Sequence, residues 1–248
     1  MIFVTGDTHG NFTRFSADIF PEQKDMTKDD YVIICGDFGI WDDSKRERYW
    51  LKWLDEKPFT TLFVDGNHEN YDLLAGYPIT EWHGGKVQHI RDSVIHLMRG
   101  QVYEICGKHF FTMGGASSHD IEAGILELDA PDFKKQRKKL DAQGALYRIN
   151  HVSWWKEELP CDEEYETAIR NLELCGWKTD YIITHCCPTG IADILGSGAY
   201  QSDRLTNFFE TVKNRCDFGC WIFGHYHENR GIEKKFVVLY EQIVQMDE

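Results

Sequence analysis

The sequence predicts a mixed α/β fold with two β-sheets, and three features of its 248 residues indicate it. Short apolar runs rich in β-branched residues recur along the chain, as expected for strands buried on both faces. Helical patterns lie between some of these runs. One further stretch is divided by glycines into short segments that are typical of antiparallel pairing.

The apolar runs are four to five residues long, which suits short buried strands. They comprise residues 2–5, 31–35, 61–64, 181–184, 220–223 and 236–240. The stretch from Val94 to Met113 differs from them because Gly100 and Gly107 interrupt it. It predicts a meander of antiparallel strands, and therefore a second sheet.

Two segments predict helices. In residues 162–177, Tyr165, Ala168, Ile169 and Leu172 recur at helical spacing, and Gly176 is suited to the C-terminal cap. Residues 131–144 have a proline at the start and a glycine at the end. The basic run of residues 134–139 falls inside this second segment, and we interpret it as a solvated helix face.

Composition predicts one globular domain over residues 1–248, since no linker, repeat or low-complexity tract divides the chain. No apolar run reaches the roughly 18 residues of a membrane span, and residues 1–10 do not resemble a signal peptide. Eight cysteines without a repeating pattern suggest reduced thiols in the cytoplasm, with the adjacent Cys186 and Cys187 free. The net charge of −14 argues against extended nucleic-acid binding.

Polar residues follow five of the strand-like runs, each time beside a glycine. The segments are FVTGDTHG, VIICGDFG, LFVDGNHEN, YIITHCCP and WIFGHYH. In open α/β sheets the carboxyl ends of strands form the ligand crevice. A single histidine or Gly-Asp pair at a strand end is usually structural, but five such clusters in succession predict a binding site. We expect glycines 6, 36, 66 and 224 to let the backbone turn tightly there.

Imidazole, carboxylate and amide oxygen together indicate divalent metal ions such as Mn, Fe, Zn, Co or Ni. The candidate metal ligands are Asp7, His9, Asp37, Asn67, His185, His225 and His227. Seven ligands exceed the needs of one four-coordinate ion but suffice for two ions that share a carboxylate. Such pairs of ions support displacement at phosphorus. No cysteine spacing matches a structural zinc site.

This series of motifs, in this order from residue 6 to residue 227, resembles the calcineurin-like metallophosphoesterases, and in style their small bacterial or phage-type members. The resemblance implies a four-layer α/β/β/α sandwich, with two mixed sheets flanked by helices. It also implies two bound divalent ions, for which we expect Mn, with Fe, Zn, Ni or Co as alternatives.

The resemblance further implies a role for each residue. Asp7, His9 and His227 would hold the first ion, Asn67, His185 and His225 the second, and Asp37 would bridge them. His68 would be the proton donor for the leaving group. The implied reaction is hydrolysis of a phosphomonoester or phosphodiester by a metal-bridging hydroxide, with Asp37 and His68 as the catalytic residues.

Three alternatives remain at this level. In phosphoprotein phosphatases of this superfamily the second motif continues to Asp-Arg-Gly, whereas GDFGIWDD has no arginine before Arg46. A nuclease would need a basic, aromatic-lined groove, which the sequence does not indicate. A non-catalytic scaffold is disfavoured because all eight motif residues are present. We therefore expect a small phosphate ester as substrate and no membrane partner.

Three features have two interpretations each. Arg148 is either a contact for substrate phosphate or a surface arginine, and we favour the surface arginine. Trp154 and Trp155 either stack on a nucleobase or pack in the interior, and we favour packing. Residues 114–120, GGASSHD, form either a substrate-contacting loop, through Ser117, His119 and Asp120, or a structural turn.

Overall fold

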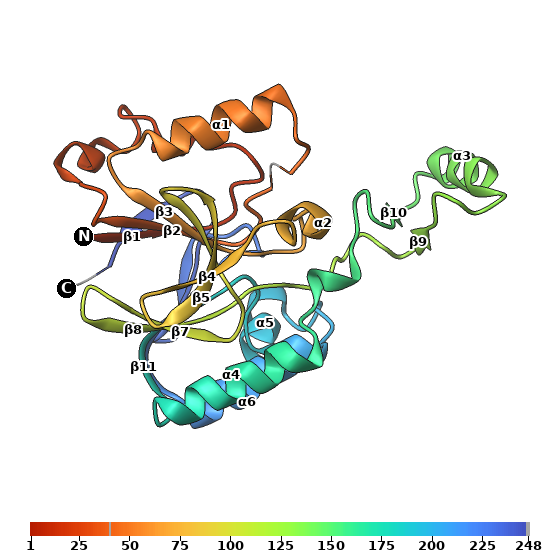
Figure 1. Cartoon of the computed structure of the whole chain (residues 1–248). Helices are drawn as coiled ribbons and strands as arrows, with labels where there is room; N and C mark the ends of the chain where they lie inside the picture. The colour runs from red at the N-terminus through yellow and green to blue at the C-terminus, as the bar shows by residue number, and fades with distance from the viewer. Residues whose placement is uncertain (40, 247–248) are drawn as a thin grey trace.

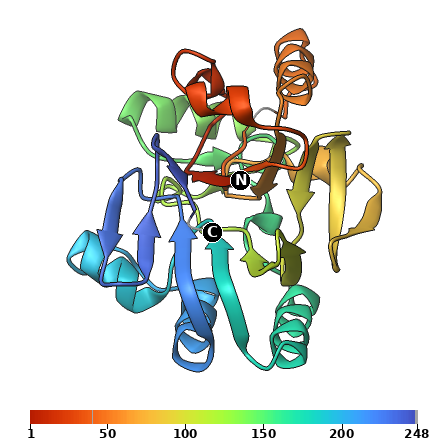
Figure 2. The same ribbon diagram turned by 90° about the vertical axis from the view of Figure 1, so that its left-hand side faces the viewer.

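The computed structural model describes residues 1–39 and 41–246, and two β-sheets pack face to face in it with helices on their outer sides (Figures 1 and 2). One apolar cluster contains residues of both sheets, including Val4, Ile33, Phe110 and Ile222, and forms the central core. Separate clusters lie beneath the helices on each outer side. This is the predicted four-layer α/β/β/α sandwich.

The first sheet has seven strands and a parallel centre in which β1, β2, β3 and β6 run side by side. The outer strands β15, β5 and β4 pair antiparallel. In order across the sheet the strands are β15 (Ile243–Gln245), β1 (Ile2–Thr5), β2 (Tyr31–Cys35), β3 (Thr60–Val64), β6 (Val94–Leu97), β5 (Gly85–Arg91) and β4 (Ile79–Trp82).

The second sheet has six strands, and β14, β12, β11 and β8 are parallel. Strands β13 and β7 pair antiparallel at its two edges. In order across the sheet the strands are β13 (Arg230–Ile232), β14 (Phe236–Val238), β12 (Asp217–Phe223), β11 (Lys178–Thr184), β8 (Lys108–Met113) and β7 (Gln101–Ile105). The two sheets therefore contain all six of the strands predicted from apolar runs.

Helix α1 (Lys45–Asp55) covers the first sheet, and α4 (Asp162–Leu174), α5 (Thr189–Gly196) and α6 (Arg204–Arg215) cover the second (Figure 1). Short helices follow strands or loops: α2 (Tyr71–Leu74), η1 (Thr13–Phe15), η2 (Pro21–Asp25) and η3 (Lys156–Glu158). Helix α4 confirms one predicted helix, with Gly176 in the left-handed conformation just beyond it. Among the described residues no helix has the length and apolar character to cross a bilayer, and all eight cysteines are unpaired.

Residues 121–153, hereafter the arm, project from the sandwich (Figure 1). The arm contains a short parallel pair, β9 (Ile125–Leu126) with β10 (Arg148–Ile149), and helix α3 (Phe133–Gln143). Helix α3 confirms the second predicted helix, and Gly144 caps its C-terminus with φ of 59°. Pro131 does not start the helix as expected, because Asp132 is the N-terminal cap and the proline precedes it.

The predicted meander is wrong in part. Of the three strands in residues 94–113, only β7 and β8 pair with each other, while β6 belongs to the first sheet, between β3 and β5. The chain crosses from one sheet to the other at residues 98–100. Gly100 has φ of +71°, and a Cβ there would lie 2.8 Å from the backbone nitrogen of Ala168 in α4. The glycine therefore permits a crossover that packs directly against a helix, rather than a hairpin turn.

A buried ion pair joins this crossover to the end of β3. Arg99 donates from Nε and Nη2 to Oδ2 of Asp65 at 2.8 and 2.5 Å. His96 and Tyr71 also contact the Asp65 carboxylate, at 3.1 and 2.9 Å. Arg99 donates in addition to the carbonyl of Glu157, at 2.7 Å. The pair thus connects the first sheet, the crossover and the segment that follows the arm.

Because Asp65→Asn removes the buried carboxylate of this pair and leaves Arg99 with the partly exposed Glu164, 3.3 Å from its Nη1, we expect the substitution to lower the free energy of unfolding by about 3–5 kcal/mol. Urea unfolding of the metal-free protein measures the loss. The matched control is Asp43→Asn, since Asp43 pairs with Arg48 on the surface at 2.9 Å and should change stability by less than about 1 kcal/mol. Equal effects of the two substitutions would contradict a special role for the buried pair.

Candidate metal centre

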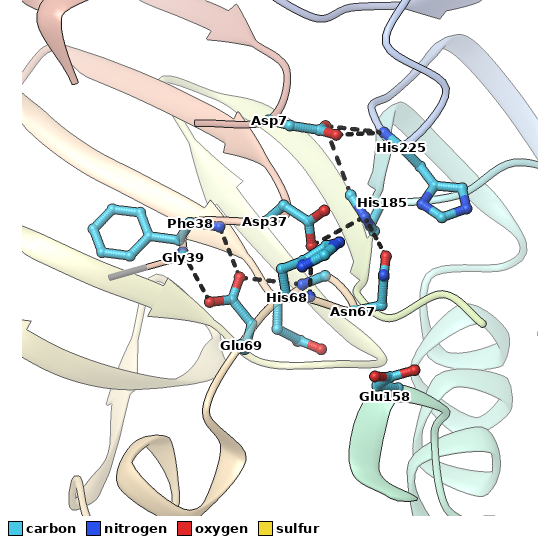
Figure 3. A network of polar contacts seen from close by, with 12 residues as sticks. Asp7, Asp37, Phe38, Gly39, Asn67, His68, Glu69, Glu158, His185 and His225 are labelled. Atoms are coloured by element: carbon cyan, nitrogen blue, oxygen red, sulfur yellow. Dashed lines mark hydrogen bonds and ion pairs between the residues drawn. The ribbon is translucent and has the colours of Figure 1, made fainter. Parts of the chain in front are cut away.

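The carboxyl ends of five parallel strands meet at one edge of the sandwich, where the two sheets touch (Figure 3). Asp7 follows β1, Asp37 follows β2, and Asn67 follows β3. His185 follows β11, and the loop after β12 carries His225 and His227. A backbone-to-side-chain hydrogen bond connects the two sheets here, since the amide of His225 donates to Oδ1 of Asp7 at 2.9 Å.

One group of side chains consists of Asp7, His9 and His227. Nε2 of His227 lies 3.1 Å from Oδ2 of Asp7 and 3.1 Å from Nε2 of His9. Nε2 of His9 lies 3.8 Å from Oδ2 of Asp7 and also 3.8 Å from Oδ2 of Asp37. The structure therefore brings together the three residues predicted for the first ion, with one oxygen of Asp37 beside them.

A second group surrounds His185. Its Nε2 lies 3.3 Å from Oδ1 of Asp37 and 3.2 Å from Oδ1 of Asn67. Its Nδ1 is 2.8 Å from the carbonyl oxygen of Cys35, which requires an N–H donor at Nδ1. Nε2 is then the nitrogen directed at the predicted second ion, and the hydrogen bond at Nδ1 fixes the orientation of the ring.

His225 stands apart from these groups. Its ring centroid is 4.9 Å from that of His185, but its Nε2 contacts Nε2 of His119 at 2.9 Å. Among residues 1–39 and 41–246, the groups with metal-ligand spacing include Asp7, His9, Asp37, His68, His185 and His227, but not His225. Its role as a ligand of the second ion stays a prediction.

The side chains fit two divalent ions. Ligand atoms about 2.0–2.2 Å from one ion lie roughly 3.0–3.6 Å from each other, and most of the measured separations are 3.1 to 3.3 Å. Asp37 directs Oδ2 toward the first group and Oδ1 toward the second. The set of imidazoles, carboxylates and an amide oxygen suits borderline metals such as Mn, Fe or Zn.

The backbone at the site is strained at the candidate ligands themselves. His9, Asp37, His225 and His227 all have positive φ, between 45° and 68°, a conformation that costs free energy and is concentrated at functional sites. The predicted role of the glycines needs correction, since only Gly36 has positive φ among glycines 6, 36, 66 and 224. The other three permit close approach: a Cβ at Gly66 would lie 2.1 Å from Oδ1 of Asp37.

Charge is concentrated on Asp37 and His185, which are both buried. Burial would raise the pKa of Asp37, but the positive charge and hydrogen bond of His185 outweigh it and hold that pKa far below its usual range. Burial would lower the pKa of His185, but Asp37, and after it Asp7, raise it to about 10. Without ions, a protonated His185 therefore balances the buried carboxylates.

Glu69 lies between the loops that follow β2 and β3 and accepts hydrogen bonds from both. Its carboxylate accepts hydrogen bonds from the amides of Phe38 (2.8 Å), Gly39 (3.1 Å) and Gly66 (3.3 Å), and from the indole of Trp41. Burial, with the nearby charge of Asp37, raises the pKa of Glu69 to about 7. Glu69 thus ties together the two loops that follow β2 and β3.

His68 lies beside the candidate ligands, and its backbone amide donates to Oδ1 of Asp37 at 2.8 Å. Its ring centroid is 5.0 Å from that of His9. Nη2 of Arg148 lies 3.2 Å from Nε2 of His68, so Nε2 is the acceptor and the neutral ring carries its proton on Nδ1. Burial lowers the pKa of His68 and Arg148 lowers it further, although Asp37 opposes them.

Arg148 is buried, so the interpretation of it as a surface arginine is wrong. Its Nε donates to Oδ1 of Asp120 at 2.7 Å, and its Nη1 donates to the carbonyl of Ser153 at 2.7 Å. The arm folds back at its base and thereby carries this guanidinium to His68. The sequence could not reveal this contact, because the two residues are 80 positions apart.

A pocket of about 340 Å³ opens beside His68, between the sandwich and the arm. Its walls include Trp41, Arg46, Arg148 and Trp155. Trp155 is buried and donates to Asp72 at 2.8 Å, as expected for packing. A larger cavity of about 500 Å³ lies at the other ends of β11 and β12, but none of the candidate ligands lines it, so its size does not mark the site.

Residues 114–120 lie beside the site, and their contact with substrate stays a prediction. Ser118 accepts a hydrogen bond from Nδ2 of Asn67 at 3.3 Å, His119 contacts His225, and Asp120 holds Arg148. Ser118 was not singled out from the sequence, and neither was Glu158, which contacts it. In the sequence, the glycines at the start of GGASSHD were the signal that pointed to the loop that carries Ser118. Glu158 follows another glutamate, and no motif distinguishes it as a functional residue.

Two comparisons with known proteins show what the chain is similar to. The family model described as calcineurin-like phosphoesterase matches residues 1–229. Lariat debranching enzyme A of Xenopus laevis is 25% identical over 175 residues, which are 62% of this chain and 30% of that enzyme. The chain thus corresponds to less than a third of that relative.

In the ion-free protein we expect His185 to be protonated at neutral pH, because its pKa is raised to about 10. A metal ion binds only the neutral imidazole, so binding should release about one proton from His185, and affinity should rise about tenfold per pH unit between pH 7 and 9. Calorimetry in two buffers with different heats of ionisation counts the protons.

The raised pKa of His185 also predicts how the stability of the ion-free protein depends on pH. Protonation of His185 stabilises the folded state, because its pKa is higher there than the unfolded value of 6.5. This contribution is fully present below pH 6.5 and is lost as the pH rises through about 10. Thermal unfolding of the ion-free protein between pH 6 and 10 should show that decline. His109→Asn, at an exposed histidine, is the control that should change neither result. Ion binding without proton release would contradict a protonated His185.

Proposed function

The chain belongs to the calcineurin-like phosphoesterase family, and on this premise we propose that it hydrolyses phosphomonoesters or phosphodiesters at a centre of two divalent ions. The observation that carries the proposal is the position of Asp37, whose two oxygens face two separate sets of ligand atoms. In such a centre the ions would supply an activated water and would neutralise charge on the phosphoryl oxygens. We expect Mn in both positions.

Asp7 and Asp37 supply two negative charges against four positive ones, so the occupied centre would attract a phosphate although the chain is acidic. Arg148 adds a buried guanidinium beside the pocket. A phosphate is a better acceptor for it than a neutral imidazole. We therefore expect Arg148 to bind the substrate phosphate and to free Nε2 of His68.

Nε2 of His68, once freed, would have to take up a proton beside the negative charge of the bound phosphate, and it would then transfer that proton to the leaving oxygen. Its backbone amide is held by Asp37, so the ring is positioned relative to the bridging carboxylate. Because His68, His9 and Asp37 also have the spacing of a metal-ligand group, the competing assignment is that His68 is a ligand. Metal content and rate separate the two assignments.

The volume of the pocket, about 340 Å³, supports a small ester as substrate. Its lining carries both signs of charge, with the acidic side chains of Asp42, Glu47 and Glu69 beside Arg46 and Arg148. The absence of the Asp-Arg-Gly sequence after Asp37 disfavours a phosphoprotein phosphatase. Retention of all eight motif residues disfavours a scaffold. A cytoplasmic location stays part of the proposal, based on the cysteine content.

A second candidate substrate is a phosphodiester within a polynucleotide, and helix α3 is the observation that favours it. Its lysines 134, 135, 138 and 139 are exposed, and no ion pair is found for them among the described residues. Lys139 and Arg148 are nine positions apart, so at most about 32 Å separates them. The matched relative is named a lariat debranching enzyme.

If His68 is the proton donor, His68→Asn should retain about two equivalents of Mn, like the parent chain, while the rate on an alkyl phosphate falls by about 10²–10⁴. The loss should be much smaller for a nitrophenyl ester, whose leaving group needs no proton. Metal analysis and rates on both esters provide the measurement.

His225→Asn is the matched comparison, because it should lose metal affinity first and activity with it. If His68→Asn releases metal as readily as His225→Asn, His68 is a ligand and the proposed proton transfer is wrong. A parent chain that saturates at one ion would instead exclude the two-ion centre.

Reversal of charge on α3 separates the two substrate classes. If a polynucleotide is bound, Lys→Glu at positions 134, 135, 138 and 139 should lower kcat/KM for an oligonucleotide about tenfold or more at low salt, because phosphate contacts are lost. The rate on a nitrophenyl phosphate should not change. Kinetics at two salt concentrations on both substrates test this.

The control reverses the exposed lysines 24, 86, 178 and 234, which lie outside the arm. Equal losses from both sets would indicate net charge rather than a binding face. No loss from the α3 set would leave the small ester as the substrate class.

A further inference from the structure

The carboxyl group of Glu158 is buried beside the proposed metal centre, although Glu158 is not one of its ligands (Figure 3). Oε2 accepts a hydrogen bond from the backbone amide of Ser118 at 3.2 Å. Oε1 is completely buried and has no hydrogen-bond partner among the described residues. Such a group is costly unless it has a function or a further partner.

A backbone hydrogen bond joins Glu158 to the loop of residues 114–120. The carbonyl of Glu158 accepts from the amide of Ala116 at 3.1 Å, so η3 is joined to the loop of residues 114–120. A Cβ at Gly115 would lie 2.5 Å from that carbonyl, and Gly115 has φ of +92°. Glycine therefore permits this close contact between the loop and η3.

Glu158 reaches Asn67 through Ser118. Nδ2 of Asn67 donates to Oγ of Ser118 at 3.3 Å. The backbone amide of Ser118 donates in turn to Oε2 of Glu158, and the proximity of Ser118 favours the ionised carboxylate. Burial and the charge of Asp37 act the other way and raise the pKa of Glu158 to about 7.

This relay determines which end of the Asn67 amide faces the metal centre. Because Nδ2 is used by Ser118, Oδ1 is directed at Nε2 of His185, 3.2 Å away. If the amide were flipped, its NH₂ group would face the cation, and an NH₂ group has no acceptor with which to ligate a cation. Hydrogen bonds that orient a ligand in this way contribute strongly to metal affinity.

We propose that Ser118 and Glu158 are positioning residues that hold the amide oxygen of Asn67 on the second divalent ion and so set the affinity of that ion. The inference rests on the proposed function, since it needs an ion at Asn67. Neither residue is proposed to touch the ion or the substrate.

The test measures Mn affinity by calorimetry. Ser118→Ala and Glu158→Ala should each weaken one of the two ions about 10–100-fold and leave the other unchanged. Glu158→Gln retains an oxygen that can accept from Ser118, so it should stay within about threefold of the parent chain. Glu157→Gln, at the exposed neighbour, is the matched control and should have no effect.

A double-mutant cycle adds a result that general destabilisation would not give. If the two residues act through one relay, Ser118→Ala with Glu158→Ala should weaken the ion no more than either single substitution. Should Glu158→Ala fail to fold, as a thermal melt without metal would show, Ser118→Ala and Glu158→Gln still decide. Additive losses, or unchanged affinities in Ser118→Ala, would overturn the relay.

Two further outcomes also count against the relay. Normal affinities with a lowered kcat in Glu158→Ala would make Glu158 a proton-transferring group. Failure of Gln to restore what Ala loses would assign the effect to the negative charge of Glu158. A parent chain that binds only one ion is distinguishable from all of these, because it removes the proposed two-ion centre itself.

Discussion

The carboxylate of Asp37 is the constraint on which the rest of the site depends. It is buried, it is negatively charged, and its two oxygens are directed at two different sets of imidazoles. A buried charge is tolerated only when opposite charge and hydrogen bonds surround it. His185 supplies the charge and the backbone amide of His68 supplies a hydrogen bond. Binding of divalent ions would take over the role of the imidazolium.

The architecture around Asp37 follows from this requirement. Strands of both sheets end at one edge, and four of the seven candidate ligands adopt left-handed conformations in the loops that follow. That strain is balanced by contacts outside the candidate ligands. Glu69 holds the loops after β2 and β3, and the Asp65–Arg99 pair holds the end of β3 to the crossover between the sheets.

The arm and the segment after it give the site features that the sandwich alone would lack. Arg148 from β10, near the end of the arm, and Glu158 from η3, shortly after it, both approach the candidate metal centre. The arm is thereby coupled to His68 at its base, while α3 presents lysines to solvent at a distance. The arm also contributes to the pocket wall and carries the basic run of residues 134–139 in an otherwise acidic sequence.

The sequence by itself determined the buried strands, two of the helices and the polar clusters at the strand ends, because these are local: apolar runs, helical spacing and motifs each lie within a few residues. Residues 94–113 show its limit, since the pattern of β6, β7 and β8 is that of a meander and only the pairing partners assign β6 to the other sheet. Tertiary structure alone decided that Arg148 is buried against His68, that Glu158 reaches Asn67 through Ser118, and that Nε2 of His225 faces His119. Each of these contacts joins side chains far apart in sequence, and their formation depends on how the two sheets and the arm pack, which no local pattern encodes.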